Sequence, residues 1–281
     1  MSYEDDFEGN EGFFDNRPND FYYMINLPNG FEKLKVDKSM IVRAVIVPYV
    51  TTVSPYTKPG KLWFSRDYYR HRGLGPEQKG SYFDCVKTFG DDKCPIGDAM
   101  HEAGVSKKSQ RMALFNLFVL QIDKEKVEKL MLLDFSFANF AEVLGTTSKE
   151  MFEMDGDSHL QHPYHPTKGA IISWKFTEET FKGAKFYKAS TFQFKPHNGL
   201  DGKIEELIPK ALDLDAALNK LSYEEARKRF ISGMPPIAKK GEGESTAETK
   251  TSKAESAKAD KAVEEAKALA TDESAFDSGW E

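Results

Sequence analysis

The chain has 281 residues, enough for one sizeable hydrophobic core with a small additional subdomain. No apolar run approaches the roughly 18 residues needed to cross a membrane, and the acidic N-terminus lacks the basic and apolar regions of a secretory signal. Two cysteines are too few for a disulfide framework, which predicts a reducing, cytoplasmic location and no membrane partner.

The net charge of −6 is distributed unevenly along the chain. Residues 1–20 and residues 241–281 each carry −6, so the body between them carries +6. Residues 1–20 are predicted to form a disordered acidic arm, and residues 237–281 a disordered acidic tail of low complexity. Acidic ends on a basic body either mimic a negative ligand of that body, dock partner proteins, or only add solubility.

The predicted body begins with short strands. Residues 40–48 are rich in β-branched side chains and predict a strand that ends at a proline, and residues 61–66 predict a second short strand. Residues 67–95 contain four glycines and are predicted to be irregular. Pro95 suits the first position of a helix, which would end near Gly104.

The middle of the chain combines a buried strand with predicted helices and a hairpin. Residues 112–122 are strongly apolar and have the length of a buried strand. A helix is predicted over residues 123–133, capped by its first aspartate, and a second over residues 135–144, ending at the following glycine. Residues 170–176 and 189–194 are predicted to be two strands joined by a glycine-containing hairpin loop.

Two helices are predicted to close the body, which spans residues 21–236. Residues 203–218 have helical periodicity, and Ser222 with Glu225 forms a capping-box pattern at the start of the last helix. Five or six short strands with inserted helices predict a mainly β, α+β fold. Their long connections favour a small closed barrel over a doubly wound sheet.

The strongest functional signal is the interleaving of basic and aromatic residues. Cationic side chains neutralise phosphates and release counterions, and exposed rings stack on unpaired bases without reading sequence. The pattern therefore predicts binding of single-stranded nucleic acid, and the alternative is a solvated basic surface with some rings in the core. The residues are Lys58, Lys61, Trp63, Arg66, Tyr68, Tyr69, Arg70 and Arg72, then Lys107, Lys108 and Arg111, and finally Lys182, Lys185, Phe186, Tyr187 and Lys188.

For three further phenylalanines the sequence does not decide whether the side chain faces the core or the surface. Phe64, Phe192 and Phe194 lie in strand-like alternation, which is equally compatible with an inward position in the core and an outward position on the surface.

A metal site is a second candidate. His71, Cys85 and Cys94 are residue types that bind zinc, and Asp98 or His101 would complete a tetrahedral set. The spacing contains no C-x-x-C pair, because the third residue after Cys94 is Gly97. Two free cysteines near a helix start are therefore the alternative interpretation.

The sequence offers no organised catalytic site. His159, His162 and His165 are interrupted by prolines and predict a polar loop. Neither a phosphate-binding Walker loop nor a nucleophile elbow is present. We therefore expect a binding protein that is not an enzyme, with a metal-dependent nuclease and a protein-interaction adaptor with a basic face as the alternatives.

The C-terminus combines acidic residues with two aromatic anchors. Such a peptide fits a partner protein's groove, and because it presents negative charge and rings it also predicts competition with DNA for a basic groove. The residues of this predicted partner-binding tail are Asp272, Glu273, Phe276, Asp277, Trp280 and Glu281.

Several segments, in order, resemble the helix-destabilising single-stranded DNA-binding proteins of tailed phages, of the gene-thirty-two type. The resemblance runs from about residue 38 to residue 236. The segments that carry it are MIVRAVIVPY, GKLWF, HR…C…CPIGDAM, FNLFVLQID, DFSFANFAEVL, HPYHPTKGAIISWKF, FKGAKFYKASTF and LSYEEARKRFISGM.

The resemblance implies an OB-fold core, a five-stranded barrel, with a zinc-type subdomain over about residues 56–106 and C-terminal helices. It implies a protein that coats and protects single-stranded DNA in replication, recombination and repair, with an acidic tail that recruits proteins of those processes. By position it places in the groove Lys61, Trp63, Lys107, Lys108, Arg111, Lys185, Phe186 and Tyr187.

Two departures from the family's pattern change what it implies. Gly97 stands where the family has its final zinc-binding cysteine, which leaves the metal set incomplete. The acidic residues 1–20 replace the family's basic cooperativity motif, so cooperative filament formation by that route is not expected.

Overall fold

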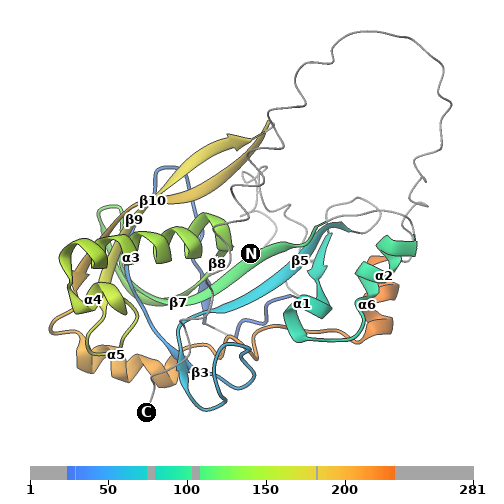
Figure 1. The fold of residues 1–281 in the computed structure, drawn as a ribbon, viewed down its shortest axis with the longest axis horizontal. Helices are drawn as coiled ribbons and strands as arrows, with labels where there is room; N and C mark the ends of the chain where they lie inside the picture. The colour runs from blue at the N-terminus through green and yellow to red at the C-terminus, as the bar shows by residue number, and fades with distance from the viewer. Residues whose placement is uncertain (1–23, 29, 75–79, 103–107, 182, 232–281) are drawn as a thin grey trace, which may run out of the picture. The chain divides into compact units, whose positions relative to one another are not determined.

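The computed structural model describes residues 24–28, 30–74, 80–102, 108–181 and 183–231 (Figure 1). The chain divides after residue 239, and everything described belongs to the first part, so the predicted acidic arm and tail lie outside the described residues. The described part has a mixed α+β fold, mainly sheet with several helices. Its helices are all too short or too polar to cross a membrane.

The main sheet is built around β2 (Ile41–Ile46), the predicted first strand. β2 pairs antiparallel with β7 (Gln110–Ile122) on one side and with β9 (Ala170–Phe181) on the other. β7 continues into the hairpin partner β8 (Glu125–Ser136), and β9 into β10 (Ala184–Pro196). The predicted hairpin between residues 170 and 194 is therefore confirmed and is longer than expected.

Short strands extend this sheet at its margins. β1 (Glu32–Lys33) pairs parallel with β8, and β5 (Arg66–Leu74) branches from β7 and pairs with β6 (Gly80–Phe83). β3 (Tyr49–Val50) and β4 (Leu62–Trp63) form a separate two-stranded sheet. The prediction of irregular structure over residues 67–95 was therefore wrong, because β5, β6 and α1 (Cys85–Phe89) occupy most of that segment.

The strand pairings among the described residues do not close a barrel. The sheet order is β1-β8-β7-β2-β9-β10, so β10 ends the sheet beside β9 and does not pair with β8. The mainly β, α+β class is confirmed, whereas the predicted five-stranded OB-fold barrel is not confirmed by these pairings.

The helix predicted over residues 123–133 is instead the strand β8. Asp123 has a positive φ of 51° and turns the chain so that Glu125 pairs with Ile122 across a tight hairpin. Met131, Leu132 and Leu133 are consecutively buried, which is the pattern of a strand covered on both faces. Pairing with the long apolar β7 thus overrides the helical preference of the Glu and Lys residues.

The second predicted helix is displaced and extended. A π-helical turn over Phe137–Ala141 leads into α3 (Glu142–Asp155), which passes through Gly145. A glycine inside a helix costs about 1 kcal/mol without ending it. The helix stops at Gly156, whose φ of 71° is the left-handed conformation typical of a helix terminus.

The remaining helices are short. α1 (Cys85–Phe89), α2 (Pro95–Glu102) and α4 (Ser158–Gln161) each follow a short irregular connection, and α2 starts at the predicted proline. α6 (Tyr223–Phe230) has the predicted capping box, with Ser222 and Glu225 bonded reciprocally. α5 (Asp201–Leu207) ends near Pro209 and is half the predicted length, and a 3₁₀ turn over Ile208–Lys210 follows it.

Two aromatic-rich clusters form most of the core. The first lies between the main sheet and α3 and includes Phe140 and Trp174. It also contains Phe192 and Phe194, each 8 % exposed, which settles both as inward-facing. The second cluster surrounds Tyr82 and joins β5, β6, α1, α2 and α6.

Candidate nucleic-acid interface and metal cluster

A series of ring contacts runs from the β3–β4 connection to the segment before β9. Tyr56 and Trp63 stack with ring centroids 6.2 Å apart, Trp63 and Phe64 lie 4.9 Å apart, and Phe64 stacks on Tyr164 at 3.7 Å. Tyr56 is 45 % exposed and the other three rings are half-buried. The series therefore offers ring surface to solvent while the core fixes its inner end, as a base-stacking platform requires.

Arg111 joins this series through a shared aspartate. Its guanidinium forms an ion pair with Asp67, and Tyr56 donates its hydroxyl proton to the same carboxylate at 3.0 Å. The guanidinium carbon lies 3.5 Å above the centroid of the Phe137 ring. Tyr56, Trp63, Asp67, Arg111 and Phe137 are called the Arg111 surface below.

The protonation state of the Arg111 surface follows from these contacts. Burial and the negative charge of Asp67 raise the pKa of the Tyr56 hydroxyl, which is therefore neutral and a donor at physiological pH. The Arg111 side chain is 38 % exposed, so one part is held by Asp67 and Phe137 and another part faces solvent.

The β9–β10 hairpin approaches the same surface. Asn139, two residues beyond Phe137, donates its side-chain amide to the carbonyl of Tyr187 at 3.2 Å. Phe186, Tyr187 and Lys188 are half-buried, while Lys185 is exposed and forms an ion pair with Glu178 at 3.1 Å. The backbone between Phe137 and Asn139 and this hydrogen bond therefore connect the Arg111 surface with β10.

Further predicted cations lie on the elements that carry these rings or on their neighbours. Lys58 and Lys61 are exposed on the β3–β4 connection, where the Lys61 carbonyl accepts from the Thr51 amide at 2.9 Å. Tyr69, half-buried on β5, pairs in register with Arg111. Lys87 of α1 places its ammonium group 5.5 Å from the Tyr69 ring, a contact the sequence analysis missed because nothing in the sequence links α1 to β5.

Arg66 and Tyr68 serve the interior, which corrects the expectation that they contact DNA. The Arg66 guanidinium forms an ion pair with Asp215 at 2.9 Å and donates to the Thr88 carbonyl at 3.1 Å. Tyr68 is 1 % exposed and donates to Asp134 at 2.8 Å. Both side chains pack inside the protein beneath β5 and do not reach the surface, where a DNA strand would bind.

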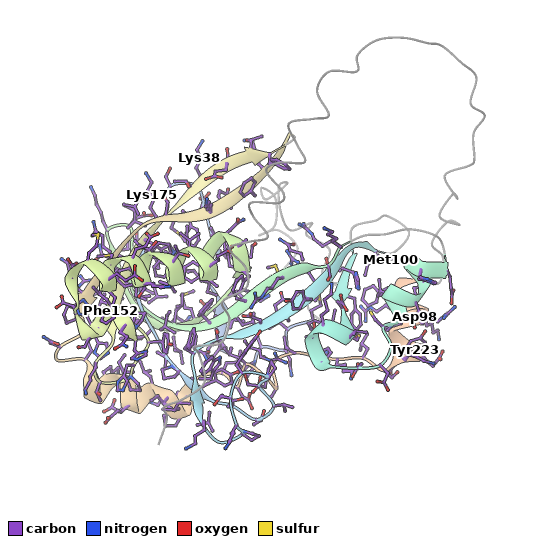
Figure 2. All side chains as sticks on the ribbon, in the orientation of Figure 1. Lys38, Asp98, Met100, Phe152, Lys175 and Tyr223 are labelled. Carbon is purple, nitrogen blue, oxygen red and sulfur yellow. The ribbon has the colours of Figure 1, made fainter. Side chains whose placement is uncertain are left out.

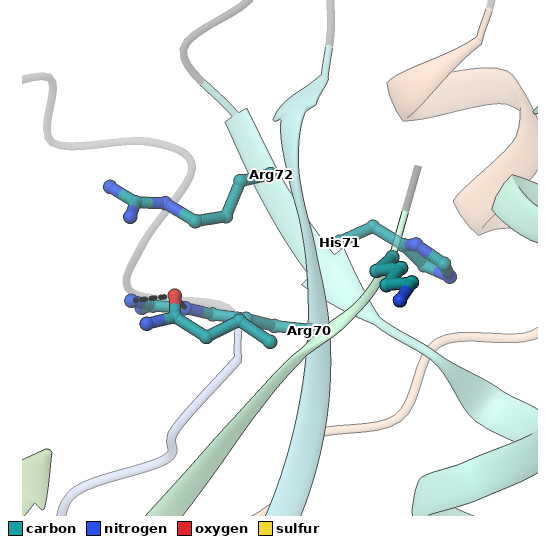
Figure 3. A pocket seen from close by; sticks show the side chains of 5 residues that line it. Arg70, His71 and Arg72 are labelled. Carbon is teal, nitrogen blue, oxygen red and sulfur yellow. Dashed lines mark hydrogen bonds between the residues drawn. The ribbon is translucent and has the colours of Figure 1, made fainter. Parts of the chain in front are cut away.

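Arg70 and Arg72 line a pocket with Lys108, Gln110 and His71 that has a volume of about 280 Å³. Arg70 is buried and donates from Nε and Nη2 to Gln110 Oε1 at 3.2 and 3.0 Å. Burial and the charge of Arg70 lower the pKa of Arg72. Figure 3 shows Arg70 and Arg72 extending to one side of β5 and His71 to the other.

The remaining predicted contacts lie outside the described residues. They are Lys107 and Lys182 of the groove, and Asp272, Glu273, Phe276, Asp277, Trp280 and Glu281 of the tail.

A cluster of potential metal ligands lies at the end of β5. His71, Asp84 and Cys94 each offer one ligand atom, and all three atoms lie within 4.8 Å of one another. His71 Nε2 is 3.7 Å from Cys94 Sγ and 3.9 Å from Asp84 Oδ2. All three residues are buried, and imidazole nitrogen, thiolate sulfur and carboxylate oxygen are zinc's preferred donors.

Cys85 completes the neighbourhood of this cluster. A hydrogen bond between the two side chains lowers the pKa of Cys94, and the same bond together with burial raises the pKa of Cys85. Both sulfur atoms also lie within 3.8 Å of the Phe83 carbonyl oxygen. The thiolate is the form in which a cysteine binds a metal ion.

The acidic member of this cluster differs from the expectation. Asp98 accepts a hydrogen bond from Tyr223 at 2.9 Å, across α2 and α6, and His101 is exposed, so neither belongs to the cluster (Figure 2). Asp84 takes that place because the residue before Cys85 caps α1 and turns its other oxygen toward His71. A Cβ atom on Gly97 would lie 3.7 Å from Cys94 Sγ, where a cysteine side chain would face the cluster.

The three loop histidines do not assemble a metal site. The only group of three or more potential ligands within the described ranges is the cluster at His71. His165 Nδ1 accepts from the backbone amides of Thr167 and Lys168, both at 3.2 Å, and so shapes a turn. The prediction of a polar loop therefore holds for His162 and His165, whereas His159 lies in α4.

No family model matches the sequence, and no curated protein matches it either.

Proposed function

We propose that this protein binds single-stranded DNA without sequence preference and coats it during replication, recombination and repair. The observation that carries the proposal is the contact network that links Trp63, Tyr56, Asp67, Arg111 and Phe137 to the β9–β10 hairpin. Part-exposed rings beside a part-exposed guanidinium supply stacking and phosphate neutralisation at one place. Neither ring stacking nor phosphate neutralisation distinguishes one base from another, so binding is expected to show no sequence preference.

Asp67 has a defined role in this proposal. Its carboxylate orients Arg111 and Tyr56 while the DNA is absent, and an incoming phosphate competes for the guanidinium. Binding therefore exchanges an internal ion pair for a phosphate contact. The net gain in binding free energy is therefore smaller than an arginine without an internal partner would give. The guanidinium is, however, already oriented before the DNA binds.

We further propose an OB-type core, a partner-binding acidic tail and a structural zinc site, which are the features that the resemblance implies. β2 pairs with one strand from each hairpin, an arrangement consistent with the first strand of an OB-type core. The acidic tail would recruit replication and recombination proteins, and the protein would not be an enzyme. His71, Asp84 and Cys94 would hold a structural zinc ion that ties β5 to the start of α2, with Cys85 beside them.

Zinc retention tests the ligand assignment. We expect the Asp84→Asn variant to lose zinc more readily than the wild type, because a carboxylate donor at the cluster is removed. Asp98→Asn is the matched control and should retain zinc, since Asp98 bonds to Tyr223. Metal content after dialysis against a chelator is the measurement, and equal retention by both variants would remove Asp84 from the site.

Binding of oligo(dT) tests the proposed function. Anisotropy of a labelled oligonucleotide, titrated at several salt concentrations, should show binding that weakens with salt by about 0.7 logarithmic units per phosphate contact. A duplex of equal length should bind far more weakly, because its bases cannot stack on the rings.

The same samples separate the alternatives. Cleavage or modification of the oligonucleotide would favour a nucleotide-processing enzyme over a coating protein. Equal affinity for duplex and single strand, or affinity that does not respond to salt, would contradict the proposed function.

A further inference from the structure

The connection between β3 and β4 is fastened to the molecule at both ends. At its start, the buried carboxylate of Asp215 accepts hydrogen bonds from Thr51 Oγ1 and from the two backbone amides that follow. At its end, Gly60 turns the chain with a φ of 82° and donates its amide to the Thr51 carbonyl at 2.8 Å. Residues 54–59, called the strap below, run between these two fixed points.

Tyr56 holds the middle of the strap against β4 and β5. Its hydroxyl donates to Asp67 Oδ2 at 3.0 Å, and its ring stacks on Trp63. The amides of Ser54 and Tyr56 bond to acceptors inside the β3–β4 connection. Within the part of the chain that the structure describes, the Tyr56 hydroxyl is therefore the only polar group of the strap that bonds outside this connection.

Releasing Tyr56 does not leave Asp67 without a partner. Arg111 Nε donates to the same carboxylate oxygen, Oδ2, at 2.9 Å, and the Arg111 Nη2 group donates to it as well. Opening the strap therefore breaks one hydrogen bond and one ring contact, while the buried carboxylate keeps its charge partner. Such a motion costs far less free energy than separating a buried ion pair.

The ring that Tyr56 covers has an unmet hydrogen bond. Trp63 contacts the Tyr56 and Phe64 rings, but its indole Nε1 is buried and has no hydrogen-bond partner among the described residues. A buried donor without an acceptor raises the free energy of this closed arrangement. A ligand with a flat ring and acceptor atoms at the edge of that ring would satisfy the indole, and nucleobases have both.

We propose that Tyr56 is a positioning residue that occupies, in the free protein, the place on Trp63 where an unpaired base stacks. The inference rests on the proposed binding of single-stranded DNA. The strap moves away when DNA binds, and the incoming base replaces the Tyr56 ring and offers an acceptor to the indole N–H. A base within a duplex cannot take this place, because its two faces are already stacked on its neighbours. The exchange therefore selects unpaired strands.

Quenching of tryptophan fluorescence by acrylamide tests the strap without DNA, so this outcome does not depend on the proposed function. In a Trp280→Phe background the remaining tryptophans are Trp63 and Trp174, and Trp174 is only 1 % exposed. Tyr56→Phe keeps the covering ring and removes its hydrogen bond to Asp67. We expect quenching about twofold stronger than in the background chain, because the open population rises.

Tyr223→Phe in the same background is the matched control. It removes a hydroxyl that donates to Asp98 at 2.9 Å, between α6 and α2. Its quenching should equal that of the background chain. If Tyr56→Phe also leaves quenching unchanged, the hydrogen bond to Asp67 does not hold the strap closed and the proposal is overturned.

Affinity for oligo(dT) separates a residue that gives way to a base from one that stacks on it. Tyr56→Ala should raise affinity about threefold, because the ring no longer competes for Trp63. Tyr56→Phe should raise it about twofold for the same reason. Weaker binding by Tyr56→Ala would make Tyr56 itself the stacking surface and would overturn this inference alone. No binding by the wild type would overturn the proposed function and the inference together.

Discussion

Arg66 and Arg111 are both arginines from basic, aromatic-rich segments, and both are paired with an aspartate, yet they occupy different environments. The Arg66 and Asp215 side chains are 6 % and 2 % exposed, whereas those of Arg111 and Asp67 are 38 % and 6 % exposed. Arg66 sits where β5 begins, against the β3–β4 connection, while Arg111 lies above the Phe137 ring.

The difference shows that burial, rather than residue type, separates a structural arginine from one able to bind a ligand. Asp215 accepts hydrogen bonds from Thr51 Oγ1 at 2.7 Å and from the Thr52 and Val53 amides, in addition to its ion pair with Arg66. A pair surrounded in this way cannot exchange its partner for a phosphate. The Arg111 pair can, since its guanidinium reaches solvent.

The largest expected effect is on stability at the buried pair. Asp215→Ala removes the partner of a buried guanidinium and the acceptor of the buried Thr51 hydroxyl. We expect the free energy of unfolding to fall by about 3–5 kcal/mol. Urea denaturation followed by tryptophan fluorescence measures it.

The control for this variant is Asp157→Ala, at an exposed aspartate whose side chain makes no cap hydrogen bond. It should change the free energy of unfolding by less than about 0.5 kcal/mol. If Asp215→Ala is equally mild, burial does not distinguish the two pairs.

A smaller effect is expected on DNA affinity at the Arg111 surface. Arg111→Gln removes a charge-assisted phosphate contact, so affinity for oligo(dT) should fall about tenfold. The slope of affinity against salt should decrease by about 0.7. Lys149→Gln, an equal change of charge on α3, is the control and should leave both quantities unchanged.

Asp67→Asn should act in the opposite direction. Without the competing carboxylate the guanidinium is free to bind phosphate, so affinity at low salt should rise about threefold. Titrations of Arg111→Gln and Asp67→Asn with oligo(dT) under the same conditions compare their affinities. Weaker binding by Asp67→Asn would mean that the aspartate matters more for positioning Arg111 than as a competitor.

The elements that sequence reasoning predicted well are those in which local pattern and tertiary contacts agree. β2 and β7 are β-branched or apolar runs that become central strands, and α6 begins at its capping box. β8 was mistaken for a helix because its first residues are rich in Glu and Lys. Only the pairing with β7 makes this segment a strand.

The candidate sites were predictable by residue type but not by side-chain direction. The rings and cations of residues 58–72 were identified, yet nothing local shows that Arg66 and Tyr68 turn inward while Tyr69 meets Lys87. Asp84 was missed as a potential ligand because its position depends on the α1 cap. Such directions arise from packing between β5, β6 and α1, which are separated from β7 in the sequence.

The smallest expected effect concerns a third pair, Lys33 with Asp134, whose exposure of 32 % and 6 % resembles that of the Arg111 pair. Burial opposes ionisation of Asp134, but the positive charges of Lys33 and Arg70 outweigh it and lower the pKa of this carboxyl. Stability from the ionised form is therefore present above the unfolded-state pKa of about 3.9 and is lost as pH falls through the folded-state value.

Asp134→Asn should remove this contribution to the acid sensitivity, so its urea midpoint should change less between pH 5 and pH 3 than that of the wild type. DNA affinity at neutral pH should remain unchanged, because Asp134 bonds Tyr68, on the face opposite Tyr69 and Arg111. That result would show that partial exposure of an ion pair is not sufficient for the proposed DNA binding, and that the pair must also lie among exposed rings. A loss of DNA affinity in Asp134→Asn would show that the face opposite the Arg111 surface also contributes to the interface.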